Sequence, residues 1–328
     1  LLGAGTTAGI VAMTVPLLPA IRRAGVHLRW RFDPRHAAVR SVVGRAGWTL
    51  GYVAANQIGL TVMLSVAADT ADGLPSWYTY AFIFFQLPHG LVAVSVMTTF
   101  VPELASAWND GAVERYRARF SQGLRLVWTG VVPATVVLAV GAAPIVSGLL
   151  GRGAFGAEAQ GGTSDVLATM ALGLPGFSAY LYALRGFYAI GDTRTPFLAN
   201  VFENGLQVVL TLLLVPSASS PGVALGTAYT VAYTAAGVLA LYLLHRRVGS
   251  VATRDLGTTV VRLAVAAAAA AGASAAVRAG MPDGSAAIVE AVAVATAGLV
   301  AFVAVGLATG LAEIGQLAGA VTGRRRSE

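Results

Sequence analysis

Polar side chains stand inside several long apolar stretches of this sequence, and their types are those that bind polar solutes. Burying a polar group in hydrocarbon is costly, so each such side chain is by default a candidate for function. Asn200, Glu203 and Gln207 follow one another at helical spacing, which places them on one face of a helix. We interpret that face as the wall of a hydrated cavity; a polar contact between packed helices is the alternative. The other candidates of this kind are Asn56, Gln57, Gln86, His89 and Arg185.

The sequence lacks the usual signatures of catalysis. His89 could titrate near neutral pH, or it could serve as a hydrogen-bonded packing residue beside Pro88. Cysteine is absent and all 22 basic residues are arginine, so thiol and Schiff-base chemistry are excluded in this stretch. The four histidines are scattered, and the GRGAFG stretch at 151–156 follows an apolar run rather than a strand, as a loop would. We therefore predict no catalytic residue, no metal site and no cofactor.

The elements that carry the polar candidates are expected to be membrane helices. Hydrophobic residues make up 56% of the 328 positions and charged residues only 11%, against roughly 25% charged in soluble domains. A helix needs about 20 apolar residues to cross a bilayer. Nine apolar runs therefore predict an all-α polytopic membrane protein. They lie near 1–21, 46–68, 77–101, 125–150, 164–190, 197–216, 222–244, 258–279 and 285–311.

The arginines predict how these helices are oriented. All of them except Arg152 and Arg278 lie in alternate gaps between the runs or in the C-terminal tail. The positive-inside rule makes those gaps, and the C-terminus, cytoplasmic. The same arginines are expected to attract anionic phospholipids rather than nucleic acid. No methionine or signal segment precedes the first run, so we expect upstream helices that this chain lacks.

Prolines and glycines inside the runs predict bends and close helix contacts. Pro88, Pro133 and Pro175 each remove a backbone hydrogen bond within a span. Three glycine pairs have the small-xxx-small spacing that lets helices approach closely. The more polar stretch 103–124 is expected to lie as an amphipathic helix at the membrane interface, with a plain connector as the alternative. The glycine pairs are Gly5/Gly9, Gly47/Gly51 and Gly222/Gly226.

The segment 185–196, which reads RGFYAIGDTRTP, resembles the signature turn between two late helices of the MurJ (MviN) lipid II flippases. That family belongs to the MOP exporter superfamily. Further stretches resemble the same family in the same order along the whole chain, at 77–81, 86–90, 99–104 and 222–227. The residues of the signature turn are Gly186, Asp192, Thr193, Arg194, Thr195 and Pro196.

The resemblance implies a MOP-type helical bundle, in which this chain would run from helix 6 to helix 14 of fourteen. Residues 1–21 would then be the last helix of the N-lobe, and 22–45 a cytoplasmic Arg-rich linker. Residues 46–249 would be the six-helix C-lobe. Residues 250–328 would hold the final two transmembrane helices, which form a groove for a lipid tail, and a basic cytoplasmic tail.

The function implied by the resemblance is transport by alternating access, not catalysis. The cargo would be the undecaprenyl-pyrophosphate-linked peptidoglycan precursor lipid II, moved across the bacterial cytoplasmic membrane. Cell-wall synthesis proteins are expected as further partners. The alternatives are a sister MOP exporter for another polysaccharide-linked lipid or a drug, and a non-transporting cell-wall scaffold paralogue. Ile83 and Gln86 stand where many relatives carry an arginine and an acid in helix 8.

Overall fold

The structure of the chain is a computed structural model that describes residues 2–17, 19, 23, 37–151, 153, 155–251, 254–282 and 284–321. It divides into two compact units, Leu1–Ala46 and Gly47–Glu328. The first unit contains α1 (Leu2–Thr14) and the beginning of α3 (Ala37–Thr70). Most of the Arg-rich segment 22–45 lies outside the described residues, but its final part, 37–45, is already helical.

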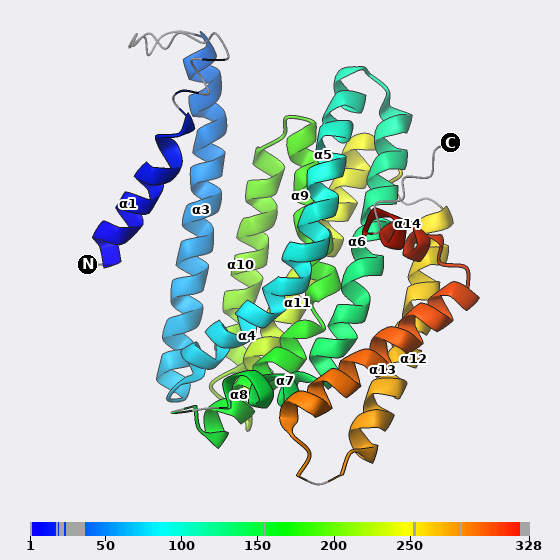
Figure 1. Cartoon of the computed structure of the whole chain (residues 1–328). Coiled ribbons are helices and arrows are strands. Elements are labelled where there is room, and N and C mark those ends of the chain that lie inside the picture. The colour runs from blue at the N-terminus through cyan, green and yellow to red at the C-terminus, as the bar shows by residue number, and fades with distance from the viewer. Residues whose placement is uncertain are drawn as a thin grey trace. The chain divides into compact units, whose positions relative to one another are not determined.

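Every regular element in the described part of the second unit is helical, which confirms the predicted all-α class (Figure 1). A π-helical turn, η1 (His89–Ala93), joins α4 to α5. The elements after α3 are α4 (Leu74–Pro88), α5 (Val94–Asn109), α6 (Val113–Val140), α7 (Ala142–Leu150), α8 (Ala157–Ala171), α9 (Leu174–Ala189), α10 (Arg194–Leu214), α11 (Pro221–Val248), α12 (Arg254–Gly280), α13 (Ala287–Ala308) and α14 (Ala312–Val321).

Seven of the described helices are long and apolar enough to cross a membrane, or eight if α8 and α9 together form one span. Nine were expected; the first run is missing because its described helix, α1, has only 13 residues, and the run at 164–190 counts only if α8 and α9 are one span. The α8–α9 pair is bent by 54°. The bend precedes Pro175, which lies in the first turn of α9 and has no N–H to continue the hydrogen-bond ladder of α8.

The prediction of a separate interfacial helix at 103–124 was wrong. Residues 103–109 end α5, residues 113–124 begin α6, and a turn at Asp110–Ala112 joins the two helices. Gly111 supplies the left-handed conformation of this turn, with φ of 70°. The polar residues stay helical because each helix continues past the apolar layer. The rings of Trp108 and Tyr116, 5.9 Å apart, pack across the hairpin.

The prolines disturb their helices to different extents. After Pro88 the chain adopts the π-helical turn η1, a common accommodation of a missing hydrogen bond. Residues 74–109 nevertheless form one long candidate span. Pro133, in contrast, lies within the uninterrupted helix α6. The expected bend is therefore sharp only at α8–α9.

Glycine contacts confirm the predicted close approach at Gly222/Gly226. A Cβ on Gly226 would lie 2.7 Å from the carbonyl oxygen of Val166, so α11 and α8 meet almost backbone to backbone. A Cβ on Gly51 would lie 2.8 Å from the ring of Phe197 on α10. Among the described residues, no atom lies within 4 Å of such a Cβ on Gly47, Gly5 or Gly9. Only part of the small-residue pattern therefore marks helix contacts.

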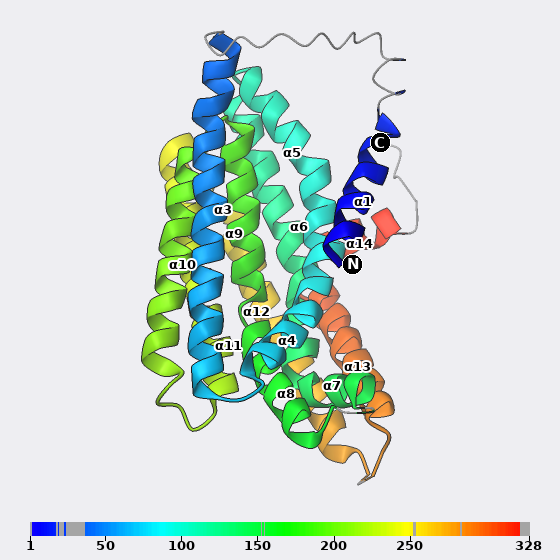
Figure 2. The same ribbon diagram turned by 90° about the vertical axis from the view of Figure 1, so that its left-hand side faces the viewer.

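The arginine-rich gaps meet at one end of the second unit. In both views the α5–α6 turn, the α9–α10 turn and the end of α11 lie at the top (Figures 1 and 2). Arg115, Arg194 and Arg246 lie at or near these three places. Arg278 is at the end of α12, at the opposite end of the unit. Arg152 and the tail arginines 324–326 lie outside the described residues.

The last helices pack on α6 through a small core of their own. Leu263 on α12 and Phe302 on α13 belong to this cluster together with Val136 on α6. An ion-pair network adds to it near the arginine-rich end. The Nε atom of Arg125 on α6 lies 2.9 Å from Glu313 on α14, and its Nη1 atom lies 3.5 Å from Asp255 on α12.

Replacing Arg125 by Gln is expected to lower the free energy of unfolding by about 1–2 kcal/mol. Glu313 is only 7% exposed, so its carboxylate would stay buried without a cation, whereas Asp255 is exposed and screened by solvent. Thermal unfolding of the purified full-length protein in detergent measures the loss. Arg115→Gln, which removes an exposed pair with Asp110, is the control and should cost less. Equal losses would contradict the role given to burial.

Candidate functional site

The middle of α10 buries a polar cluster inside the second unit. Glu203 is fully buried and Asn200 is 1% exposed. The Nδ2 atom of Asn204 donates to Oε2 of Glu203 at 2.8 Å and to the backbone oxygen of Asn200 at 3.0 Å. Asn200, Glu203 and Gln207 therefore lie on one face of α10, as predicted, and that face is buried in the interior of the second unit.

Tyrosines from four other helices surround this cluster. Each of them interacts electrostatically with Glu203. The rings of Tyr229 and Tyr233 lie 4.4 Å apart, and the hydroxyls of Tyr180 and Tyr229 are buried. Sequence reasoning missed this set. Its only signal is the four-residue spacing of Tyr229 and Tyr233. The full set is Tyr52, Tyr78, Tyr180, Tyr229 and Tyr233.

The same face of α10 packs against α3. The Nε2 atom of Gln207 donates to the sulfur of Met63 at 3.0 Å, which is a weak acceptor. Gly59 makes room for the polar cluster, since a Cβ there would lie 3.0 Å from the Cβ of Asn204. Asn200, Glu203 and Gln207 thus face neighbouring helices, an arrangement that supports the interhelical interpretation over an open cavity wall.

The remaining polar candidates lie on the surface of the second unit. Asn56 and Gln57 are exposed on α3, Gln86 is exposed on α4, and Arg185 is exposed near the end of α9. The exposed face of Gln86 continues through Gly90 and the threonines of α5. The structure therefore divides the predicted set into an interior cluster and an exposed group, and Arg185 of the exposed group interacts electrostatically with the interior His89.

His89 belongs to the interior. It is 6% exposed, and its Nδ1 atom lies 2.9 Å from the hydroxyl oxygen of Ser178 on α9, to which it is hydrogen-bonded. Its ring also meets that of Phe177 edge to face, with centroids 4.8 Å apart. The contact joins the π-helical turn η1 to α9. This geometry fits the packing role that was one of its two interpretations.

The signature turn at 185–196 ends one helix and starts the next. Gly191 has a φ of 78°, and its amide donates to the carbonyl of Tyr188 while the amide of Asp192 donates to that of Phe187. These two bonds form a Schellman motif that closes α9. Oδ1 of Asp192 then accepts from the amides of Arg194 and Thr195, which caps the first turn of α10. Gly191 and Asp192 of the motif thus serve to end α9 and to begin α10.

Two further residues of the signature tie this turn to other helices. Gly186 lets α6 and α11 approach α9, because a Cβ there would lie 2.9 Å from the hydroxyl of Tyr116. That hydroxyl donates to the carbonyl of Gly186 at 2.9 Å. The guanidinium of Arg194 lies 5.7 Å from the ring centre of Trp48, near the start of α3 within the second unit. The remaining turn residues are Thr193 and Pro196.

Replacing Asp192 by Ala is expected to cost about 1 kcal/mol of unfolding free energy, because two amides at the start of α10 lose their acceptor. Asp192→Asn, which keeps the side-chain oxygen, should retain most of that stability. Thermal unfolding of both variants beside the unchanged protein measures the difference. An Asn variant as unstable as the Ala variant would show that the cap is not the cause.

A polar cleft of about 430 Å³ lies at the arginine-rich end, between α5 and α6. Glu103, Arg115 and Arg119 line it with Pro102 and Ser106. The Nε atom of Arg119 lies 3.2 Å from Glu103, so these charges are largely matched. Within the described residues, no group of three potential metal ligands comes together.

Comparison with known proteins gives consistent matches. Residues 1–291 match the family model described as "Lipid II flippase MurJ". The chain is 31% identical over 220 residues to the "Probable lipid II flippase MurJ" of Rhizobium meliloti, which covers 66% of this chain and 40% of that protein. It is 28% identical over 274 residues to the protein of the same name from Synechocystis, which covers 81% of this chain and 50% of that protein.

A solved structure shares the fold. The chain resembles "Lipid II flippase MurJ, inward closed conformation" with a TM-score of 0.61 and 23% sequence identity, over 77% of this chain and 51% of that chain. At this identity the likeness concerns the fold alone. The chain spans about half or less of the length of these proteins.

Proposed function

Because the chain belongs to the MurJ lipid II flippase family, we propose that it forms the C-terminal lobe and final helices of a lipid II transporter. Its family consists of transporters rather than enzymes, as the resemblance at 185–196 implied. The transporter moves lipid II from the inner to the outer leaflet by alternating access. The observation that carries the proposal is the family match, which extends over residues 1–291.

The physical task explains why a hydrated path suffices. A disaccharide-pyrophosphate head group would lose its hydration in hydrocarbon, at a free-energy cost far above that of moving its apolar tail. A polar surface between two lobes keeps the head group solvated while the tail stays in the bilayer. The exposed Asn56, Gln57 and Gln86 are suited to such a wall, since uncharged amides can both donate and accept hydrogen bonds.

We place the protein in the bacterial cytoplasmic membrane with its arginine-rich end inside the cell. The gathering of the α5–α6 turn, the α9–α10 turn and the end of α11 at one end supports this orientation (Figure 1). The C-terminus is then cytoplasmic. Anionic phospholipids and cell-wall synthesis proteins complete the proposed partners.

Complementation tests the proposed function. The full-length gene is expressed in flippase-depleted bacteria, and the measured quantity is the fraction of lipid II accessible to an enzyme added at the outer face. Restored accessibility is expected. Failure, with the protein shown to be inserted, would contradict lipid II transport and favour the sister exporter or the scaffold.

Gln86→Leu is expected to reduce lipid II accessibility about tenfold in the same assay, because an exposed group able to hydrogen-bond the charged head group is lost. Its exposure on α4 means that folding should be unaffected. Ile83→Leu, at an exposed apolar position one turn away, is the matched control and should retain full activity. Unchanged transport by Gln86→Leu would remove this residue from the wall.

A further inference from the structure

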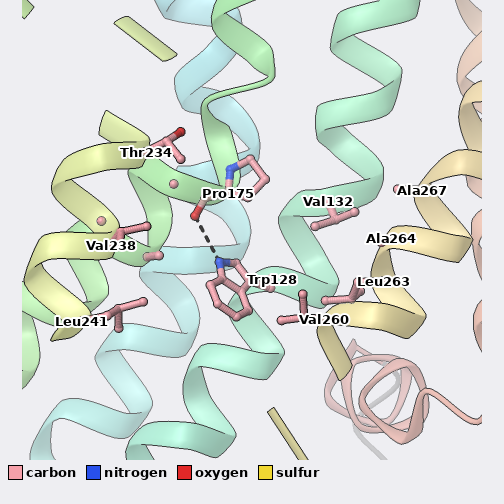
Figure 3. A pocket seen from close by; sticks show the side chains of 13 residues that line it. Trp128, Val132, Pro175, Thr234, Val238, Leu241, Val260, Leu263, Ala264 and Ala267 are labelled. Atoms are coloured by element: carbon pink, nitrogen blue, oxygen red, sulfur yellow. Dashed lines mark hydrogen bonds between the residues drawn. The ribbon is translucent and has the colours of Figure 1, made fainter. Parts of the chain in front are cut away.

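An apolar hollow of about 340 Å³ lies between α6, α9, α11 and α12 (Figure 3). Its volume is in the range of small-molecule binding pockets. Among its lining residues only Trp128 and Thr234 carry a polar side-chain atom. A water molecule needs two or more polar partners to stay in such a space, so the hollow suits hydrocarbon rather than water.

The walls of the hollow are built by specific contacts. The indole Nε1 of Trp128 donates to the carbonyl oxygen of Pro175 at 3.1 Å, which fixes the ring between α6 and α9 (Figure 3). At the inner side α9 and α11 nearly touch, since a Cβ on Gly237 would lie 2.7 Å from the carbonyl oxygen of Gly176. The hollow is thus a space between α12 and the helices α6, α9 and α11 that side chains do not fill.

The hollow opens on the outer surface of helices that are candidate membrane spans. The lining helices α6, α11 and α12 are all candidate membrane spans. Val238 on α11 is 66% exposed and Val260 on α12 is 44% exposed, so the rim opens to the surface of the unit. Figure 2 shows α10 and α11 on the side of the bundle away from α5.

Side chains at the arginine-rich end lie close to the open side of the hollow, and the guanidinium of Arg246 lies over the ring of Tyr242, one turn beyond the rim residue Val238. His245 lies one turn beyond Leu241 on α11, and it is followed by Arg246 and Arg247 in the last turn of that helix. All three are exposed. Arg125 lies one turn before Trp128 on α6, where it pairs with Asp255 and Glu313. Arg125 is matched by these two carboxylates, so the positive charge near the open end of the hollow comes from Arg246 and Arg247.

We propose that this place is a binding site for an anionic phospholipid of the cytoplasmic leaflet, with one acyl chain in the hollow and the phosphate beside His245 and Arg246. Burial of the chain and pairing of the phosphate with arginine both stabilise this arrangement. Four lining residues belong to α12 and none to α13, so the hollow lies between α12 and the bundle rather than between α12 and α13. The lipid would fill the gap between α12 and the bundle, and the site does not depend on the transported substrate.

Photocrosslinking of the purified full-length protein tests this site. The probe is phosphatidylglycerol with a photoreactive group in one acyl chain, in vesicles of phosphatidylcholine. Labelling is expected on peptides that contain Trp128, Val238 and Leu263. Unlabelled phosphatidylglycerol should compete better than phosphatidylcholine or undecaprenyl phosphate. Equal competition by phosphatidylcholine, or stronger competition by undecaprenyl phosphate, would overturn the assignment.

Variants give a second, independent readout. Ala264 lines the hollow at an exposed position of α12, and Ala264→Phe should reduce the labelling about tenfold by filling the slot. Ala275→Phe, at an exposed position of the same helix outside the hollow, is the control and should label normally. Arg246→Gln should weaken the preference for phosphatidylglycerol several-fold. Normal labelling of Ala264→Phe would overturn the proposal. If that variant does not fold, the lipid competition on the unchanged protein decides.

Discussion

Replacing Glu203 by Leu is expected to lower the free energy of unfolding by about 3 kcal/mol. The carboxyl group is fully buried and accepts a hydrogen bond from Asn204. Leucine would take away that acceptor and the carboxyl group with which five tyrosines interact, and each buried polar group left unpaired costs about 1–3 kcal/mol. Unfolding of the purified full-length protein in detergent, followed by tryptophan fluorescence, measures the loss.

Glu203→Gln is the matched control for this experiment. Glutamine has nearly the same shape and keeps a side-chain oxygen that can accept from Asn204, so a loss of about 1 kcal/mol or less is expected. Equal losses of stability in the Leu and Gln variants would contradict this explanation, because the hydrogen-bond acceptor for Asn204 would then not be the cause of the loss. The Glu203 variants test a contact in the interior through stability, whereas Gln86→Leu tests an exposed side chain through transport.

Gly226→Leu is expected to prevent stable packing of α11 on α8, at a cost of about 3 kcal/mol or more. A Cβ at this position would lie 2.7 Å from the carbonyl oxygen of Val166 and 3.0 Å from the amide nitrogen of Met170. Both are backbone atoms, so neither can move without bending α8. The yield of monodisperse protein and its thermal midpoint measure the effect.

Gly205→Leu is the control for the glycine variant. Gly205 lies on α10 and is exposed, and within the described residues a Cβ there would meet no atom within 4 Å. Leucine also favours helix over glycine by about 0.5–1 kcal/mol, so stability should stay equal or rise. A loss at Gly205 as large as that at Gly226 would show that close helix contact is not the cause.

The sequence alone determined the class of this protein and much of its local structure. A charged fraction of 11% and long apolar runs require membrane helices, because a soluble surface needs more charge. The segment 185–196 carries its own helix end, turn and cap in Gly191 and Asp192, so it was recognisable without tertiary context. The same segment also pointed to the family that the comparisons show.

Helical periodicity also placed Asn200, Glu203 and Gln207 on one face, but it could not say what that face meets. Only the tertiary structure showed that the face is buried against α3 and among tyrosines of four helices. Gln86 looked equivalent in the sequence, yet it is exposed. The reason is that the helical repeat determines which residues share one face of a helix, whereas the burial of that face depends on the neighbouring helices.

Helix ends and gaps between helices were likewise decided by tertiary packing. The polar stretch 103–124 became the ends of two long helices, because α5 and α6 support each other beyond the apolar layer. The hollow at Trp128 arises where α6, α9, α11 and α12 fail to meet completely. A sequence specifies the surface of each helix, while the space left between helices exists only once their crossing positions are set.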